Sequence, residues 1–262
     1  NADDELVYAM KEGLKCNIAY FSMDENNPRI KKHCKAGGYA AVFENGYITI
    51  MKGTWKIRVI KVSEVPVTYG GKALHNVMNC LPAVLSTYFW RDIEIEDIKL
   101  ALQTFVPSSA QTPGRLNMFQ FKHFQFLVDF AHNPAGLELL CDFISKLDGE
   151  PKVGIISGTG DRRDEDIKEL GRISGRSFDE IIIRQDKNLR GRTAEEIVNL
   201  LVEGINETKT KDIPIEIIYN EKEAIMHAYN NAKPGSLITI MCDVVAEALD
   251  LIKGLKEKED AE

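Results

Sequence analysis

Apolar and polar positions alternate in a regular order along the second half of the chain. From residue 116 on, short apolar runs are separated by longer segments with apolar residues at helical spacing. After a short strand that precedes residue 124, the predicted strands are 124–128, 153–157, 180–184, 215–219 and 236–242, and the predicted helices are 134–147, 165–174, 194–205, 221–230 and 244–255. This alternation is typical of an α/β fold with a mostly parallel, doubly wound sheet. The charged tail from residue 253 onward predicts a frayed end.

The first hundred residues follow a less regular pattern. Strands are predicted at 17–22, 40–43, 47–52 and 55–60, and helices at 28–36, 76–89 and 94–105. The last two strands alternate around Gly53-Thr54, which is typical of a β-hairpin. Residues 106–113 are rich in turn formers and predict a linker. We therefore expect two domains, residues 1–106 and residues 107–262.

Polar residues follow three successive strands of the predicted parallel sheet. The residues in question are Asp129, His132 and Asn133 after the first strand, Asp161, Arg162, Arg163 and Asp164 after the second, and Arg190 and Arg192 after the third. The carboxyl ends of parallel strands meet at one edge of the sheet, and open α/β sheets bind ligands at that edge. The sequence therefore predicts a ligand crevice there.

The residues after the first strand have two interpretations. A carboxylate such as Asp129 can accept hydrogen bonds from a ribose, and His132 or Asn133 can meet an adenine ring. Alternatively, Asp129 or Asn133 caps the helix that starts at Pro134. Asn133 can serve as the cap in either case.

The charged run after the second strand also has two interpretations. Arg162 and Arg163 can clamp a carboxylate, while Asp161 and Asp164 can pair with a guanidinium. The glycines before this run would let the backbone approach a ligand closely. The alternative is an exposed charge cluster in which Asp164 caps the next helix.

The third loop combines a possible ligand site with a local capping motif. Arg190 and Arg192 flank a glycine, an arrangement that suits a phosphate or a carboxylate. Thr193 and Glu196 form a capping box, which explains Thr193 without any ligand.

Composition and charge exclude several classes of protein. The net charge of −7 and the pI of about 5.4 disfavour a non-specific nucleic-acid surface. The five cysteines lack the spacing of a metal site or a disulfide framework, which predicts reduced and mostly buried thiols. No apolar run reaches membrane-spanning length and no signal peptide is recognisable. We therefore expect a cytoplasmic protein without membrane or nucleic-acid partners.

Four short motifs point to one family. They are Pro113-Gly-Arg115, Asp129-Phe-Ala-His-Asn-Pro-Ala-Gly136, Gly160-Asp-Arg-Arg-Asp-Glu-Asp166 and Leu189-Arg-Gly-Arg192. Together they resemble the C-terminal domain of the Mur ligases, which form amide bonds to amino acids at the expense of ATP, and among these the cyanophycin synthetases. The resemblance implies a Mur ligase C-terminal domain with a Rossmann-like, mostly parallel sheet. Segments near residues 1–4, 19–22 and 41–46 resemble the end of the Mur central domain, which implies that residues 1–106 are a truncated piece of it.

The resemblance assigns roles to individual residues. It implies that Arg115 reaches the ribose and phosphates of ATP, that Asp129 binds the ribose, and that His132 and Asn133 border the adenine. Asn76 belongs to a His75-Asn76-x-x-Asn79 element whose first Asn approaches the adenine in Mur ligases; the alternative is that Asn76 caps its helix. The loop 161–164 would lie beside the incoming amino acid or the acyl acceptor, and Arg190 and Arg192 would bind a phosphate or carboxylate.

One motif that a Mur ligase needs is missing. The chain has no glycine-rich phosphate loop ending in Gly-Lys-Ser/Thr, and Gly70-Gly71-Lys72 is only a partial approach. We therefore interpret the chain as a C-terminal fragment that holds half of an active site and is inactive alone. The resemblance implies that upstream domains of the same chain supply the phosphate loop, most Mg²⁺ ligands and an ATP-grasp domain. We assign no residue here as catalytic or metal-binding.

The resemblance also implies a reaction and its partners. ATP would phosphorylate a carboxylate of a poly-aspartate chain, and arginine would then attack the acyl phosphate. Partners would be ATP, arginine and an acidic peptide polymer, and the protein would be a homo-oligomer. Two alternatives stay open: another Mur-type ligase, of the peptidoglycan-precursor or folylpolyglutamate class, and a non-catalytic module that binds a nucleotide or a partner. We also expect the linker at residues 106–113 to act as a hinge, about which the C-terminal domain rotates between open and closed states.

Overall fold

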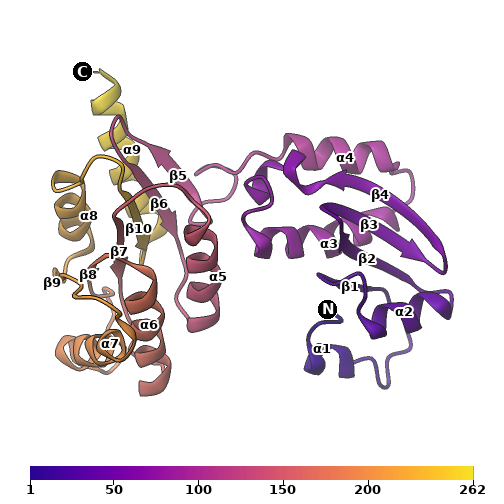
Figure 1. Cartoon of the computed structure of the whole chain (residues 1–262), viewed down its shortest axis with the longest axis horizontal. Helices are drawn as coiled ribbons and strands as arrows, with labels where there is room; N and C mark the ends of the chain where they lie inside the picture. Colours follow the sequence, from indigo (N-terminus) through magenta and orange to yellow (C-terminus); the bar gives the residue numbers. More distant parts are fainter. Residues whose placement is uncertain (262) are drawn as a thin grey trace. The chain divides into compact units, whose positions relative to one another are not determined.

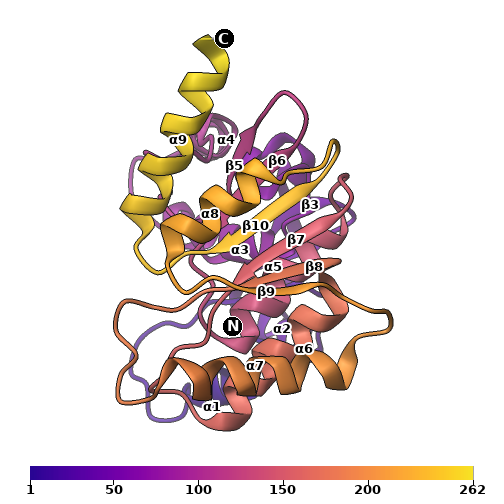
Figure 2. The same cartoon turned by 90° about the vertical axis from the view of Figure 1, so that its left-hand side faces the viewer.

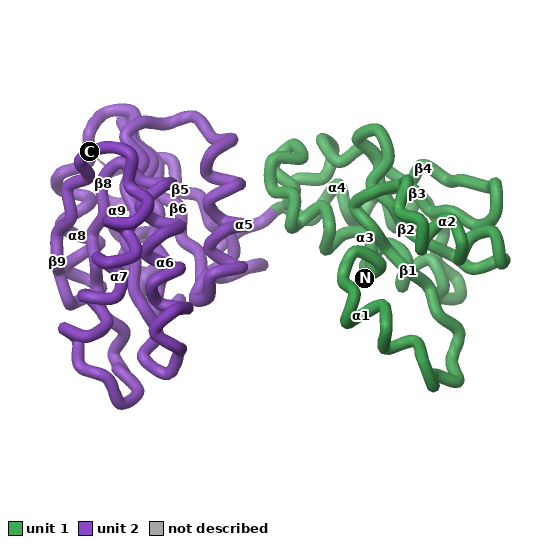
Figure 3. Tube along the Cα trace, turned by 60° about the horizontal axis from the view of Figure 1, so that its bottom comes forward, with its two compact units in different colours: residues 1–106 green, residues 107–262 purple. Residues whose placement is uncertain are grey.

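The computed structural model describes residues 1–261 and contains two compact units. Figure 3 colours them separately: Asn1–Val106, the N-terminal unit, and Pro107–Glu262, the C-terminal unit. Each unit has its own sheet. Each unit also forms its own hydrophobic core.

The N-terminal unit is built on a four-stranded sheet with the order β1-β2-β3-β4. Its elements are α1 (Glu5–Ala9), β1 (Tyr20–Ser22), α2 (Pro28–Lys35), β2 (Tyr39–Glu44), β3 (Tyr47–Lys52), β4 (Trp55–Lys61), η1 (Val62–Glu64), η2 (Pro66–Thr68), α3 (Leu74–Tyr88) and α4 (Ile95–Thr104). The first two strands are parallel and the others are antiparallel. The predicted hairpin is confirmed, since Lys52 pairs with Trp55 across its turn.

Both faces of this sheet are covered. Helices α3 and α4 bury Val77, Leu81 and Ile98 against β3 and β4, whereas α2 buries Ile30 and Cys34 on the opposite face. The short helices α1, η1 and η2 were not predicted, because segments of three to five residues are too short to show helical periodicity.

The C-terminal unit contains a six-stranded sheet with the order β5-β6-β10-β7-β8-β9. Its elements are β5 (Asn117–Gln120), β6 (Gln125–Asp129), α5 (Pro134–Ser145), β7 (Lys152–Ile156), α6 (Asp164–Ser177), β8 (Glu180–Ile183), α7 (Ala194–Thr208), β9 (Ile215–Ile217), α8 (Glu221–Asn230), β10 (Leu237–Met241) and α9 (Val245–Ala261). All neighbours are parallel except β5 and β6. The predicted α/β fold with a mostly parallel sheet is confirmed.

Helices cover both faces of the six-stranded sheet (Figures 1 and 2). Helices α8 and α9 lie on one face, where Ile225 and Ile252 pack against strand residues such as Ile155 and Ile240. Helices α5, α6 and α7 lie on the other face. The last strand, β10, returns to the middle of the sheet between β6 and β7, so the chain reverses its winding direction there. Such a switch point opens a crevice at the carboxyl ends of the strands.

The predicted fraying of the tail is wrong, because α9 continues through Ala261. The backbone N–H of Lys122 donates to both carboxylate oxygens of Glu259, at 3.0 and 3.1 Å. Lys256 pairs with Glu259 and Asp260 on the same helix. Glu259 thus holds α9 to the β5–β6 hairpin, and the pairs of Lys256 support the last turns of the helix itself. Within residues 1–261, no helix is long and apolar enough to cross a membrane.

Candidate functional site

Loops from four strands surround a pocket at the carboxyl edge of the six-stranded sheet. The pocket, which we call the crevice, has a volume of about 150 Å³. It is lined by residues that follow β6 (Phe130, Ala131, His132), β7 (Ser157, Thr159, Arg162), β8 (Arg184, Asp186, Arg190) and β10 (Cys242, Asp243). The structure therefore brings three of the predicted site residues, His132, Arg162 and Arg190, to one pocket.

Asp129 ends β6 beneath the crevice and is only 8% exposed. Its carboxylate Oδ2 accepts a hydrogen bond of 2.9 Å from the backbone N–H of Leu116. Burial raises the pKa of this carboxyl, while the Leu116 N–H and the charge of Arg115 oppose the rise. Asp129 does not cap α5; of the two residues expected as its cap, Asn133 takes that role. Its carboxylate fixes the turn that precedes β5.

Arg115 lies in that turn, which we call the 112–117 turn. Asn117 closes the turn: its side-chain oxygen accepts from the Gly114 N–H at 2.7 Å, and its amide donates to the Thr112 carbonyl at 2.9 Å. The Arg115 side chain is exposed, and its guanidinium carbon lies 5.9 Å from the centre of the Phe130 ring. Arg115 is therefore presented on a rigid turn and remains available to an anion.

His132 and Asn133 take different roles in the loop after β6. His132 is exposed, its Nδ1 lies 3.0 Å from the Phe130 carbonyl oxygen, and its ring lies 5.0 Å from the Phe130 ring. Asn133 is the N-cap of α5, because its side-chain oxygen accepts from the Gly136 N–H at 2.8 Å. The cap expected of Asn133 is confirmed, and its oxygen is committed to it.

Ion pairs join the loops after β7 and β8, residues 158–164 and 186–192, which we call the paired loops. Arg190 donates to Asp161 at 2.7 Å, and Arg192 donates to Asp164 at 2.7 Å and to the Gly160 carbonyl at 2.9 Å. The hydrogen bond from Arg190 holds the pKa of Asp161 below its usual value. Asp164 is the first residue of α6 and makes no cap, so its predicted capping alternative is wrong.

The two remaining arginines of the second loop differ. Arg163 is turned to its own helix, where it makes a bidentate pair with Asp166 at 2.7 and 2.9 Å. Arg162 is exposed, lines the crevice, and makes no side-chain hydrogen bond or ion pair with any residue from 1 to 261. Among the predicted substrate-binding arginines, Arg162 is therefore the one whose charge is available to a ligand in the crevice.

The glycines of the second loop serve loop packing. A Cβ at Gly160 would lie 2.0 Å from the carbonyl oxygen of Leu189. The backbone approach that Gly160 permits is thus between the paired loops, where we had expected an approach to a ligand. Arg190 and Gly191 make the turn of the third loop with φ of +48° and +91°. The predicted capping box of Thr193 and Glu196 is confirmed.

Two charged residues at the centre of the edge, Arg184 and Asp186, were not predicted as site residues. Arg184 is 1% exposed and pairs with Asp186 at 2.7 Å and with Glu221 at 3.0 Å. Asp186 also accepts a hydrogen bond from the Ser157 hydroxyl at 3.0 Å. The sequence did contain a signal for Arg184, because this arginine directly follows the apolar run Ile181-Ile-Ile183. A charge at the end of a buried strand is rarely unpaired, so charged partners could have been expected nearby.

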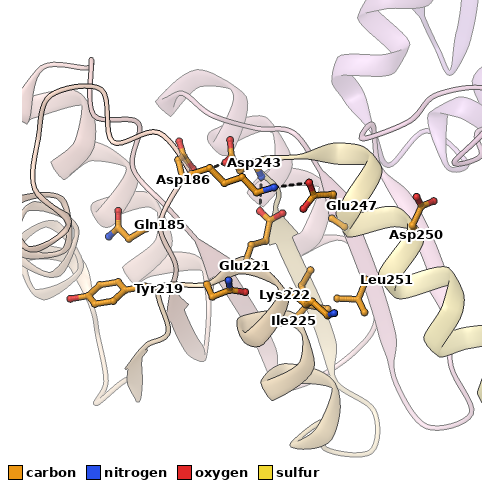
Figure 4. A pocket seen from close by; sticks show the side chains of 13 residues that line it. Gln185, Asp186, Tyr219, Glu221, Lys222, Ile225, Asp243, Glu247, Asp250 and Leu251 are labelled. Atoms are coloured by element: carbon orange, nitrogen blue, oxygen red, sulfur yellow. Dashed lines mark hydrogen bonds and ion pairs between the residues drawn. The ribbon is translucent and has the colours of Figure 1, made fainter.

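A second, larger pocket adjoins the crevice on the side of α8 and α9 (Figure 4). It has a volume of about 780 Å³ and shares Asp186 and Asp243 with the crevice. Its other acidic residues are Glu221, Glu247 and Asp250, so we call it the acidic pocket. Lys187 lies at its wall and pairs with Glu247 at 2.6 Å. The carboxyl edge is therefore basic on the side of Arg162 and acidic on the side of α8 and α9.

Asn76 belongs to the N-terminal unit. It lies in the first turn of α3, whose N-cap is Ala73, so the capping alternative for Asn76 is wrong. Its amide donates to the Val67 carbonyl at 2.8 Å. Asn76 and Asn79 line an apolar pocket of about 370 Å³ between α3 and α4. In the part of the chain that the structure describes, no cluster of three or more His, Cys, Asp or Glu could hold a metal ion.

Comparisons with known proteins agree with this architecture. Residues 114–243 match the family model "Mur ligase, glutamate ligase domain". The chain is 40% identical over 256 residues to the cyanophycin synthetase of Synechocystis sp., which covers 98% of this chain but 29% of that protein. The chain therefore spans less than a third of the length of that relative.

Solved structures show the same fold at lower identity. A murein peptide ligase from Psychrobacter arcticus superposes with a TM-score of 0.56 and 17% identity, over 92% of this chain and 46% of that one. A bifunctional folylpolyglutamate synthase/dihydrofolate synthase with Mn, AMPPNP and L-glutamate bound superposes with a TM-score of 0.59 and 18% identity, over 90% and 53%. These two structures show the shared fold alone. The family model over residues 114–243 and the curated relative show that the chain contains a Mur ligase C-terminal domain and is similar along nearly its whole length to cyanophycin synthetases.

Proposed function

We propose that this chain is part of an ATP-dependent ligase that joins arginine to the aspartate side chains of a poly-aspartate chain. The observation that carries the proposal is the 40% identity to the Synechocystis cyanophycin synthetase across 98% of the chain. In the proposed reaction, ATP transfers its terminal phosphate to a side-chain carboxylate. The amino group of arginine then attacks the acyl carbon, the C–N bond forms, and inorganic phosphate leaves.

The charges of the carboxyl edge support a basic amino acid as the substrate. Arg162 offers the α-carboxylate a guanidinium partner, and a guanidinium–carboxylate pair can be bidentate. The acidic pocket offers carboxylates to a cationic side chain, and Lys187 with Glu247 shows that a cation is accommodated at its wall. The guanidinium of the substrate arginine would compete with Lys187 for the carboxylate of Glu247. A substrate with one anionic and one cationic end fits both halves of the edge.

Two of the proposed nucleotide ligands are free to make contacts. Arg115 is exposed on the 112–117 turn. His132 is also exposed, and its Nε2 takes no part in the contact between Nδ1 and the Phe130 carbonyl oxygen. The Asp129 and Asn133 side chains each hold the local backbone. We propose that Arg115 and His132 contact ATP directly, that Asp129 and Asn133 position them, and that Asn76 buttresses the pocket of the N-terminal unit. ATP supplies the phosphoryl group, and Mg²⁺ would neutralise its phosphates.

The proposal assigns the phosphate loop to another part of the intact enzyme. No Gly-Lys-Ser/Thr phosphate loop occurs in this sequence, and the chain covers 29% of the Synechocystis relative. The isolated chain should therefore release no ADP, whereas the intact enzyme should.

The test is an ADP-release assay with the intact enzyme that contains this chain. Purified enzyme receives ATP, Mg²⁺ and a short poly-aspartate primer, and the amino acid is arginine, lysine, glutamate or diaminopimelate. Release that depends on both arginine and primer, with arginine incorporated into polymer, is the expected result. The isolated chain serves as the matched negative control.

The other outcomes separate the alternatives. Release that depends on glutamate or diaminopimelate, and not on arginine, would replace the proposal by a folylpolyglutamate or peptidoglycan class of ligase. Full arginine-dependent activity after Arg115 and Asp129 are both replaced by Ala would reduce the C-terminal unit to a non-catalytic module. The sequence favours arginine-dependent release, because its relative at 40% identity is a cyanophycin synthetase.

A further inference from the structure

Arg184 is one of the largest fully buried side chains of the protein, with 1% of its surface exposed. A buried guanidinium is rare, because removing a charge from water is costly unless partners replace the water. The first partner is the carboxylate of Asp186 at 2.7 Å. The second is the Met241 carbonyl, which accepts from Nε at 3.2 Å and also from Nη2. The third is the carboxylate of Glu221 at 3.0 Å.

These partners come from three different elements of the carboxyl edge. Asp186 lies in the loop after β8, Met241 ends β10, and Glu221 is the first residue of α8. Each carboxylate also makes a second bond. Asp186 accepts from the hydroxyl of Ser157 after β7, and Glu221 accepts from the backbone N–H of Asp243 at 2.6 Å. One side chain therefore ties together the ends of β7, β8 and β10 and the start of α8.

The network lies where the crevice meets the acidic pocket. Arg184 lines the crevice, Glu221 lines the acidic pocket, and Asp186 lines both. Figure 4 shows Asp186 and Asp243 near each other at the edge of the acidic pocket, with Glu221 close to Asp243. Asp243 in turn accepts from the Lys187 N–H at 2.8 Å, which fixes the start of the loop that carries Arg190. The position of the third loop thus depends on bonds that begin at Arg184.

We propose that Arg184 is a positioning residue for the amino-acid substrate. It holds Asp186 and Asp243 at the boundary between the two pockets, where the two ends of a basic amino acid would separate. The proposal rests on the proposed function, since it concerns the binding of that substrate. It assigns Arg184 no contact with ATP, whose proposed ligands lie after β6 and in the 112–117 turn.

Variants that keep the net charge of the network can separate a positioning role of Arg184 from a role in folding. One buried cation is paired with two largely buried carboxylates, so Arg184→Met leaves both carboxylates without a counter-charge and destabilises the unit. The double variant R184M/E221Q removes one positive and one negative charge, and its network keeps the net charge of the wild type. R184K keeps the cation but has a single nitrogen where the guanidinium uses three.

The experiment measures ADP release by the intact enzyme as a function of arginine and of ATP concentration. R184M/E221Q and R184K should fold, as judged by urea unfolding, and should raise the KM for arginine about 10-fold or more, with R184K the milder of the two. The KM for ATP should stay within about 2-fold in both. Arg176→Met, which removes the arginine of α6 that pairs with Glu138 of α5, is the matched control and should change neither constant.

Each outcome decides between the proposals. A folded R184M/E221Q enzyme with a wild-type KM for arginine overturns the positioning role and leaves the proposed function intact. Equal rises in the KM for arginine and for ATP also overturn it, because the effect would then be a general loss of structure. A wild-type enzyme without arginine-dependent ADP release overturns the proposed function, and the inference with it.

Discussion

The 112–117 turn and the paired loops use polar side chains in opposite ways. In the turn, Asp129 and Asn117 are buried and bond to backbone N–H groups, so they fix one shape. In the paired loops, Asp161–Arg190 and Asp164–Arg192 are ion pairs whose four side chains are 25% to 66% exposed. An exposed pair contributes little to stability and opens at low cost. The turn is therefore a fixed support, whereas the charged side chains of the paired loops can exchange their partners for a ligand.

The substitution with the largest expected effect on stability is Gly160→Ala, which tests whether a close backbone contact holds the paired loops together. Gly160→Ala places a Cβ 2.0 Å from the backbone oxygen of Leu189, which cannot move without its loop. We expect the free energy of unfolding to fall by about 3 kcal/mol, the upper end of the usual cost of overpacking. Urea unfolding of the C-terminal unit within the chain measures this loss.

Gly191→Ala is the matched control in the partner loop. No heavy atom lies within 4 Å of a Cβ built there, but the φ of +91° strains any side chain. We expect a loss of only about 1 kcal/mol. Equal losses at Gly160 and Gly191 would show that backbone conformation, and not the contact with Leu189, governs the packing of the paired loops.

The next effect tests the fixed support. Asp129→Ala removes the carboxylate that accepts a hydrogen bond from the Leu116 N–H in the buried turn, and the loss of this bond to a charged group costs about 2 kcal/mol. In the intact enzyme, the KM for ATP should also rise, because Arg115 is carried by the same turn. Asp161→Ala is the control from the paired loops and should lower the urea midpoint only slightly. A stable Asp129→Ala protein with an unchanged KM for ATP would remove both roles from Asp129.

The fold could be predicted from the sequence because its signals are local. Apolar runs and capping residues such as Asn133 and Thr193 lie next to the elements that they define, and the structure has a helix or strand where each was expected. Such local patterns do not reveal contacts between segments that are distant along the chain. Gly204 allows α7 to approach the Lys168 carbonyl of α6, where a Cβ would lie 2.0 Å away, and no periodicity reveals such a partner.

The candidate site was predicted in part for the same reason. Motifs placed Arg162 and Arg190 at strand ends, and parallel strands bring such ends together. Which charges pair is a property of the folded loops, so the sequence could not show that Asp161 and Asp164 are occupied by Arg190 and Arg192. Arg184 was missed because its partners lie 2, 37 and 57 residues away along the chain.

A smaller effect separates two neighbouring arginines. Arg162 faces the crevice without a side-chain partner among residues 1–261, whereas Arg163 is held by Asp166. Arg162→Ala in the intact enzyme should raise the KM for arginine about 10-fold, which corresponds to about 1.4 kcal/mol. Arg163→Ala should raise it less than about 2-fold. A reversed order would place the substrate carboxylate on the outer side of α6, away from the crevice.

The smallest effect is a difference in pH dependence between the two regions. Burial raises the pKa of Asp129 above its ordinary value of 3.8, so the folded protein binds this proton more tightly than the unfolded chain does. Ionisation of Asp129 therefore lowers stability as the pH rises from about 4 through the raised pKa. Asp129→Asn lacks this loss, and its Tm relative to wild type should rise across that range.

Asp161 should show the opposite sign. Its hydrogen bond from Arg190 lowers the pKa below 3.8, so its contribution is present above the unfolded pKa and is lost as the pH falls through the folded pKa. Asp161→Asn should therefore have a slightly lower Tm than wild type at neutral pH and an equal one at about pH 2. Differential scanning calorimetry of the three proteins from acid to neutral pH measures both trends. If the two variants moved in the same direction, the carboxylates of the fixed turn and of the paired loops would share one electrostatic environment, and the distinction between support and exchangeable surface would fail.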